Sequence, residues 1–207
     1  MSHHGAPVTT SELMLQIAIR SFADRGYEAT SMRQIAQDVG VKPASLYNHY
    51  PAKEDLLWAI VEDAITELEA RQDAAVEVDV TPLRALRTFV RVHVRYHATH
   101  AQEARIVNAR IRVLSSERYA RVLDFRKRYE RRLRDLLVGG DADGSFDLVD
   151  VKTTTFAILQ MGMAISDWYR PDGELDPEEL CDRYERHALR LIGVRVPDEP
   201  TLERLAE

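Results

Sequence analysis

Cysteine is almost absent from this 207-residue chain, in which Cys181 is the only example. A single thiol excludes internal disulfides and a four-cysteine zinc site, so we expect a cytoplasmic, reducing environment. No run of eighteen apolar residues occurs, so the sequence predicts no membrane-spanning helix. Glycine-rich phosphate loops, serine-hydrolase elbows and zinc-protease motifs are also missing. We therefore expect neither an enzyme nor a bound cofactor.

Acidic charge is present in excess, but not at the start of the chain. The net charge is −6, whereas residues 1–53 hold five basic and four acidic side chains. The excess acid therefore lies after residue 53. A neutral-to-basic beginning attached to an acidic remainder is compatible with nucleic-acid contact through the beginning alone.

The spacing of apolar residues predicts helices throughout, because no segment alternates apolar and polar residues as a strand would. Thr9 with Glu12 forms a capping box, Gly26 is expected as a left-handed cap, and Asp147 as an N-cap. The expected helices cover residues 9–26, 31–39, 43–50, 52–75, 82–100, 102–114, 116–138, 147–169 and 177–193. We predict an all-α fold with a three-helix domain at 1–53 and a larger helical domain at 54–207.

Residues 32–57, "MRQIAQDVGVKPASLYNHYPAKEDLL", hold two short helices separated by Gly40, which is the helix-turn-helix arrangement. Such short helices need packing from elsewhere. The side chains predicted to point outward from the second helix are Lys42, Ala44, Ser45, Tyr47, Asn48 and His49. Hydroxyl, amide and imidazole groups can meet base edges or phosphates. A solvated helix face is the alternative, but no acid occurs between Lys42 and Lys53.

The stretch "FADRGYEATSMRQIAQDVGVKPASLYNHYPAKEDLL", residues 22–57, resembles the TetR-type family of bacterial repressors. The resemblance implies a homodimer that binds a palindromic DNA operator and is released by a small-molecule effector held in the second domain. By the same resemblance, Ser31 and Arg33 lie near the DNA, and Lys53 contacts a phosphate. Lys42 and Pro43 depart from the family's usual Ser or Thr followed by a small residue.

Residues 156–165, "FAILQMGMAI", are apolar on nearly every side, with Gln160 the exception. This pattern predicts a buried helix, at a dimer interface and beside a pocket. The last helix carries an apolar stripe, and two such helices per subunit would form a four-helix interface. A monomer core is the alternative.

The segment "ISDWYRPDGELDPEEL", residues 165–180, resembles a subset of the family that responds to acyl-coenzyme A. Residues 105–134 contain eleven Lys and Arg against three acids, which indicates a solvated face or a phosphate site. The side chains predicted to line the ligand site are His93, His97, Arg126, Phe156, Gln160 and Trp168.

Three histidines, His93, His97 and His100, lie on one predicted helix. Side chains four residues apart share a helix face, so two imidazoles could hold a metal. A polar pocket lining is the favoured interpretation. A metal-dependent helical enzyme is the alternative hypothesis, and a ligand-independent DNA-binding protein is the third.

Overall fold

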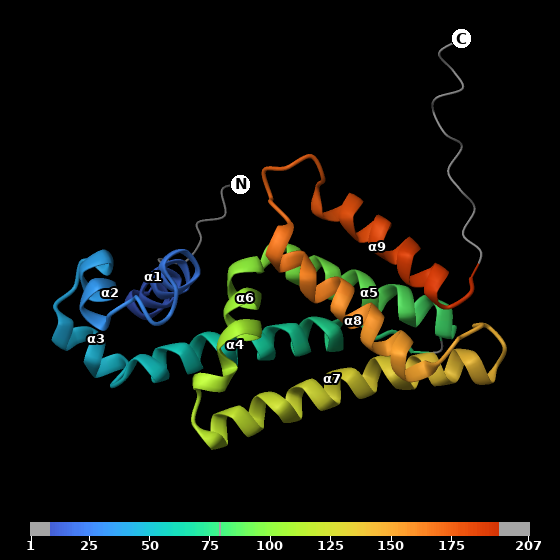
Figure 1. Ribbon diagram of the computed structural model, residues 1–207, viewed down its shortest axis with the longest axis horizontal. Helices are drawn as coiled ribbons and strands as arrows, with labels where there is room; N and C mark the ends of the chain where they lie inside the picture. The colour runs from blue at the N-terminus through green and yellow to red at the C-terminus, as the bar shows by residue number, and fades with distance from the viewer. Residues whose placement is uncertain (1–8, 79, 195–207) are drawn as a thin grey trace, which may run out of the picture. The chain divides into compact units, whose positions relative to one another are not determined.

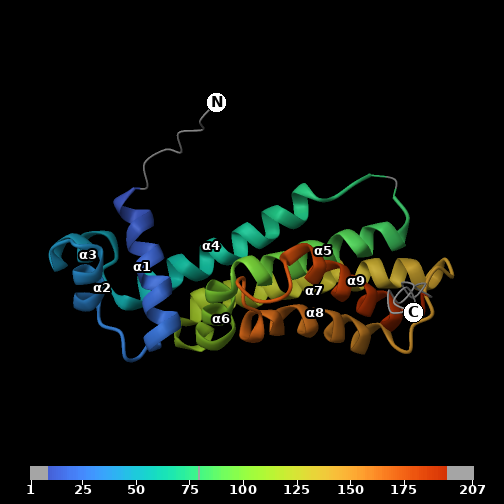
Figure 2. The same cartoon turned by 90° about the horizontal axis from the view of Figure 1, so that it is seen from above.

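A computed structural model describes residues 9–78 and 80–194, and these residues form helices and no strand (Figures 1 and 2). The helices are α1 (Thr10–Arg25), α2 (Met32–Val39), α3 (Pro43–His49), α4 (Lys53–Ala74), α5 (Pro82–Thr99), α6 (Ala101–Arg110), the 3-10 turn η1 (Ile111–Val113), α7 (Ser116–Ala142), α8 (Val151–Trp168) and α9 (Pro177–Leu191). The predicted all-α fold is confirmed. Within the described residues, no helix has the length and apolar character needed to cross a membrane.

The chain packs as two units, and α4 and α7 contribute to both. The first unit contains the described residues up to Ala70 together with His100–Lys127, and the second contains Arg71–Thr99 with the described residues from Arg128 onward. Packing therefore groups α6 and the first part of α7 with the helix-turn-helix. The domain boundary after residue 53 stays a prediction, because a functional domain need not coincide with a packing unit.

The first unit is built around helices whose ends are satisfied locally. Thr9 and Glu12 form the expected capping box on α1, and Ser31 with Gln34 forms a second one on α2. The N-cap of α3, Lys42, has no side-chain cap, and Pro43 follows it at the first helical position, where its missing N–H costs nothing. The apolar core of this unit includes Met14, Phe22, Ile35, Leu46, Leu57, Trp58, Ile106 and Val122.

Several expected boundaries were wrong. Helix α8 begins at Val151 and is capped by Asp150, whose carboxylate accepts from Thr153 N at 2.7 Å. Asp147 instead donates its backbone N–H to the Ile192 carbonyl at 2.9 Å, so it belongs to a loop contact. Gly26 has φ 86° and ψ 151°, which is outside the left-handed helical region.

Two further helix ends also differ. The segment expected as one helix over 102–114 divides into α6 and η1, and α7 continues four residues beyond 138 to Ala142. The Phe146 ring packs directly against α7 at Gly140. A Cβ at this position would lie 2.1 Å from the ring, so only glycine fits there. Propensity alone places a stop at the Gly139-Gly140 pair, but packing of Phe146 overrides it.

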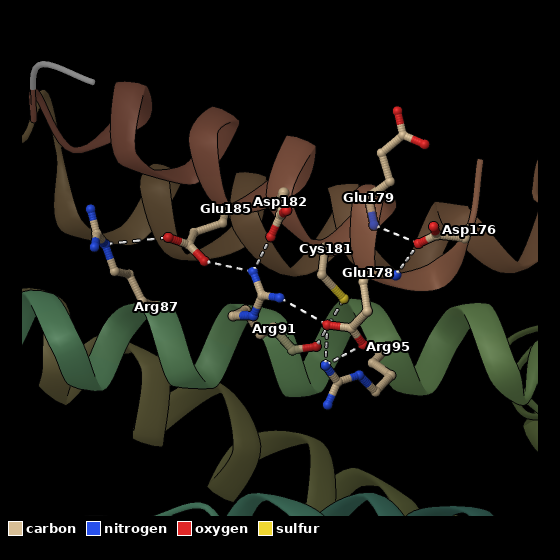
Figure 3. Close-up of polar contacts among 9 residues, drawn as sticks. All are labelled: Arg87, Arg91, Arg95, Asp176, Glu178, Glu179, Cys181, Asp182 and Glu185. Atoms are coloured by element: carbon tan, nitrogen blue, oxygen red, sulfur yellow. Dashed lines mark hydrogen bonds and ion pairs between the residues drawn. The ribbon is translucent and has the colours of Figure 1, made fainter. Parts of the chain in front are cut away.

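The second unit holds α9 against α5 through buried apolar side chains and a row of ion pairs (Figure 3). Leu180 and Ala188 are buried. Arg91 pairs with Glu178, Asp182 and Glu185. Arg87 also pairs with Glu185, and Arg95 with Glu178. Three guanidinium groups thus meet three carboxylates, and this matching fixes the register of α9 on α5 more than it adds stability.

Helix α8 approaches α5 closely at Gly162. A Cβ on Gly162 would lie 2.2 Å from Cδ2 of the buried His93 ring, so no larger residue fits without displacing it. Gly139, on the exposed side of α7, has nothing within 4 Å of the position of a Cβ. The two glycines therefore serve different purposes, although both lie within helices.

We expect Gly162→Ala to lower the free energy of unfolding by about 1–3 kcal/mol, since the methyl group overpacks the His93 contact. Gly139→Ala is the matched control and should raise it by about 0.5–1 kcal/mol, because alanine restricts the unfolded chain. Urea unfolding of both variants tests this. Shifts of the same sign in the two variants would contradict the assigned role of Gly162.

Candidate DNA-binding and effector sites

The outer side of α3 presents a row of polar side chains with no acid among them. Lys42, Ala44, Tyr47, Asn48 and His49 are exposed and Ser45 is half-buried. Leu46 is fully buried, whereas its neighbour Tyr47 is 44% exposed. The six residues predicted to point outward therefore lie on the solvent-facing side of α3. A helix face of this kind is the one that enters a DNA groove in helix-turn-helix proteins.

Helix α2 supplies the other two predicted contacts of the motif. Arg33 is exposed in its first turn. Ser31 is the N-cap, and its hydroxyl donates to Gln34 Oε1 at 2.9 Å and accepts from Gln34 N at 3.2 Å. The Ser31 side chain therefore caps the N-terminus of α2, the end of the helix that carries Arg33.

Lys53, the first residue of α4, does not project freely. Its ammonium donates to the Tyr27 carbonyl at 2.9 Å and to the Thr30 carbonyl at 3.2 Å. The nitrogen also lies 4.2 Å from the centroid of the Tyr27 ring. The phosphate contact expected from the family resemblance stays a prediction.

A buried chain of hydrogen bonds crosses the second unit. Gln72 Nε2 donates to Tyr129 Oη at 3.0 Å and to the Phe89 carbonyl at 3.1 Å. Tyr129 Oη lies 3.0 Å from His93 Nδ1, and His93 Nε2 lies 3.1 Å from the Leu159 carbonyl. A carbonyl only accepts, so His93 Nε2 carries the proton, and Tyr129 donates to Nδ1. The chain links α4, α5, α7 and α8.

Sequence analysis missed Gln72 and Tyr129. One signal was available, since Gln72 follows Leu68 by four residues and so falls on the apolar stripe of α4. A polar residue at such a position needs a buried partner. Nothing in the sequence indicated which partner, because Tyr129 is 57 residues away.

The environment of His93 favours its neutral form. Burial lowers the pKa of His93 to about 4, and the hydrogen bond to the Leu159 carbonyl opposes that shift only in part. Burial also raises the pKa of Tyr129 above its ordinary value. Both groups are therefore uncharged near neutral pH, as a hydrogen-bonded core requires.

The histidine row does not form a metal site. His93 and His97 are both buried, with ring centroids 4.6 Å apart. Both nitrogens of His93 already have hydrogen-bond partners, and His100 lies near Glu67, with Nε2 and Oε1 separated by 3.4 Å. In residues 9–78 and 80–194, no group of three or more His, Cys, Asp or Glu could hold a metal ion.

The structure places the predicted ligand-site residues in different environments. His93 and His97 are buried, whereas Phe156, Gln160 and Trp168 are exposed on α8. Phe156 is 42% and Trp168 is 48% exposed. The helix over 156–165 is therefore not covered on every side within one chain, and its burial at a dimer interface stays a prediction. One face of α8 stays open to a further partner.

Most of the arginines on α7 are paired with acids. Arg118 pairs with Glu54 and Asp55, and the other pairs are Arg121–Glu62, Arg132–Asp73 and Arg134–Glu130. Arg118 and Arg121 also lie over the Trp58 ring. These contacts account for a large part of the basic run without a phosphate ligand.

Arg126 differs from these arginines. It is half-buried, and burial lowers the pKa of its guanidinium. The described residues provide it with no carboxylate partner within salt-bridge distance. A partly desolvated guanidinium of this kind is suited to an anionic ligand.

Comparison with known proteins identifies the motif. Residues 14–60 match the model of bacterial regulatory proteins of the tetR family, and residues 79–192 match the tetracyclin repressor-like C-terminal domain. The chain belongs to the TetR family. Members of this family are transcriptional regulators rather than enzymes, so the metal-dependent enzyme of the alternative hypothesis is not supported.

Individual relatives extend the match over nearly the whole chain. The transcriptional repressor KstR2 of Mycolicibacterium smegmatis is 30% identical over 86% of this chain and 88% of its own length. A tetR-family regulator from Rhodococcus RHA1 superposes with a TM-score of 0.85 at 30% identity, covering 91% of this chain and 99% of that one. AibR, solved with isovaleryl coenzyme A and operator DNA, gives a TM-score of 0.78 at 28% identity, covering 90% and 100%.

We expect acidification to destabilise the protein through His93. The folded pKa of about 4 lies below the unfolded value, so the unfolded chain takes up the proton first as the pH falls. For an unfolded pKa of about 6.5, lowering the pH from 7 to 5 costs about 2 kcal/mol. The stability difference between the wild type and His93→Gln should shrink by that amount over this pH range, as measured by urea unfolding. A constant difference would contradict the assignment.

Proposed function

We propose that this protein is a homodimeric, ligand-responsive repressor that binds a palindromic DNA operator in the bacterial cytoplasm. The observation that carries the proposal is the exposed, acid-free side of α3, held in place by the buried Leu46. Residues 1–53 would form the DNA-binding domain and residues 54–207 the effector-binding and dimerisation domain. The proposed contacts to DNA come from Ser31, Arg33, Lys42, Ala44, Ser45, Tyr47, Asn48 and His49.

Dimerisation follows from the size of the DNA-binding surface. One recognition helix of seven residues buries too little surface for tight specific binding, so two copies are needed. Two copies related by a two-fold axis require a palindromic site. The open face of α8, with Phe156 and Trp168 exposed, supplies an apolar surface for a second subunit.

The proposed effector is an acyl-coenzyme A or a related apolar molecule. The AibR structure contains isovaleryl coenzyme A, and this chain shares its fold. Arg126 supports an anionic ligand, because it is half-buried with no carboxylate partner within salt-bridge distance in the described chain. Independently of Arg126, Gln160 and Trp168 on α8 keep the ligand role predicted from the sequence, with His93 and His97 as buried polar groups of the second unit.

Release from DNA is proposed to occur by a population shift. An effector that binds better to one conformation of the body favours that conformation by its difference in affinity. Helix α4 is continuous from Lys53 to Ala74 and therefore joins the end of the helix-turn-helix to Gln72, which is hydrogen-bonded to Tyr129. A change at Tyr129 or His93 would thus reach the residue that follows the DNA-binding domain.

We expect Tyr47→Ala to weaken binding to the operator by about 10–100-fold without changing the thermal unfolding temperature, since Tyr47 is exposed. The adjacent Leu46→Ala is the control. It should lower the stability by about 2–5 kcal/mol, because Leu46 is fully buried. The operator is first selected from a random-sequence duplex library with the wild-type protein. Undiminished binding by Tyr47→Ala would exclude α3 as the recognition helix.

We expect isovaleryl coenzyme A, used as the probe, to release the selected duplex at concentrations where free isovalerate does not. Arg126→Gln should raise the thioester concentration needed for release by about tenfold or more, as a lost charged hydrogen bond predicts. Arg121→Gln is the matched control on the same helix, since Arg121 is already paired with Glu62. Equal release by the free acid would exclude a role for the phosphates.

A further inference from the structure

The ammonium of Lys53 is directed into the protein, toward the loop between α1 and α2. It donates to two backbone carbonyls, those of Tyr27 at 2.9 Å and Thr30 at 3.2 Å. The nitrogen also lies 4.2 Å from the centroid of the Tyr27 ring. Tyr27 is 5% and Thr30 is 1% exposed, so the ammonium meets the backbone of two buried residues in this loop.

The donors of this ammonium are already used. A lysine has three N–H groups and no acceptor. Two of them go to the carbonyls of Tyr27 and Thr30, and the third can point to the negative face of the Tyr27 ring. None is left for a DNA phosphate, unless the loop contacts break.

The contacts of Lys53 lie directly before the start of α2. Thr30 directly precedes Ser31, the N-cap of α2, and Arg33 follows within the first turn. The Thr30 hydroxyl also donates to the Gly26 carbonyl at 2.8 Å, so the loop is closed from within as well. Lys53 brings a charged group to the Tyr27 and Thr30 carbonyls, and it comes from the helix that follows the motif.

The position of Lys53 also fits this role. A cation in the first turn of α4 is unfavourable with respect to the helix dipole. Hydrogen bonds to two carbonyls and a ring face compensate for that placement. An exposed lysine making a phosphate contact would gain no such compensation in the absence of DNA.

We propose that Lys53 is a positioning residue, which fixes the start of α2 and hence Arg33 for DNA binding, and that it does not itself neutralise a phosphate. The proposal rests on the proposed DNA-binding function. It differs from the phosphate contact expected from the family resemblance. The two roles differ in a measurable quantity, because each phosphate contact contributes about 0.9 to the slope of log K against log salt concentration.

The first experiment compares Lys53→Met with Lys42→Met, an exposed lysine at the N-cap of α3. The duplex selected by the wild-type protein is titrated over a range of KCl concentrations. Lys53→Met should weaken binding by about tenfold at every salt concentration, with an unchanged slope. Lys42→Met should lower the slope by about 0.9. A fall of about 0.9 for Lys53→Met would overturn the proposal.

Hydrogen exchange of the free proteins provides a readout that needs no DNA. In Lys53→Met, amide exchange over residues 26–31 should become faster than in the wild type, whereas Lys42→Met should leave it unchanged. Unchanged exchange in Lys53→Met would overturn the positioning role. If the wild-type protein selects no duplex, the proposed function fails, and exchange still decides whether Lys53 holds the loop.

The wild-type protein supplies a test that does not depend on the folding of a variant. Reductive methylation of lysines is followed with and without the selected duplex. Lys53 should react slowly in both states, because its ammonium is hydrogen-bonded to the loop. Lys42 should react quickly and become protected by DNA. Rapid modification of Lys53 that the duplex suppresses would overturn the proposal.

Discussion

The helix-turn-helix exists only because a larger core holds it. Helices α2 and α3 have eight and seven residues, and helices of that length are unstable alone in water. Leu46 and Ile35 are fully buried in a cluster that also contains Leu57, Ile106 and Val122. The packing unit accordingly extends to α6 and the first part of α7. Every side chain proposed to meet DNA depends on this burial, because burial decides which side of α3 faces outward.

The second unit contains one buried polar chain within a mainly apolar core. Gln72, Tyr129 and His93 lie in one hydrogen-bonded chain that ends on the Leu159 carbonyl. Each link fixes the donor of the next, since the carbonyl determines the tautomer of His93. Breaking one link would leave a buried group unsatisfied, which costs about 1–3 kcal/mol. Such a chain has few alternative arrangements, and it is therefore sensitive to anything that displaces His93.

Charge is used in two distinct ways. On α7, Arg118, Arg121 and Arg132 are matched by acids of α4, so these arginines connect helices. The outer side of α3 has no acid to match Lys42. The net charge of −6 conceals this contrast, because ion pairs occupy many of the basic side chains of the body, such as Arg118 and Arg132, and leave them less available to a ligand.

The sequence by itself determined the all-α class, the helix-turn-helix and the family. Short-range signals suffice for these, since capping residues, Pro43 and apolar spacing act within a few residues along the chain. It also identified the outward row of α3, because Leu46 has to be buried. It did not place α8 correctly: the start at Val151 depends on Asp147 bonding to Ile192, 45 residues away along the chain.

The tertiary structure alone decided the partners of the polar groups. Three sets of contacts join residues at least 23 positions apart in the sequence. They are the hydrogen bonds of Lys53 to Tyr27 and Thr30, the hydrogen bond of Gln72 to Tyr129, and the ion pairs between arginines of α7 and acids of α4. Spacing along one helix shows which side chains share a face, but not which face of another helix lies opposite. That choice is made by packing in three dimensions, where the low dielectric of the interior requires each buried polar group to have a partner.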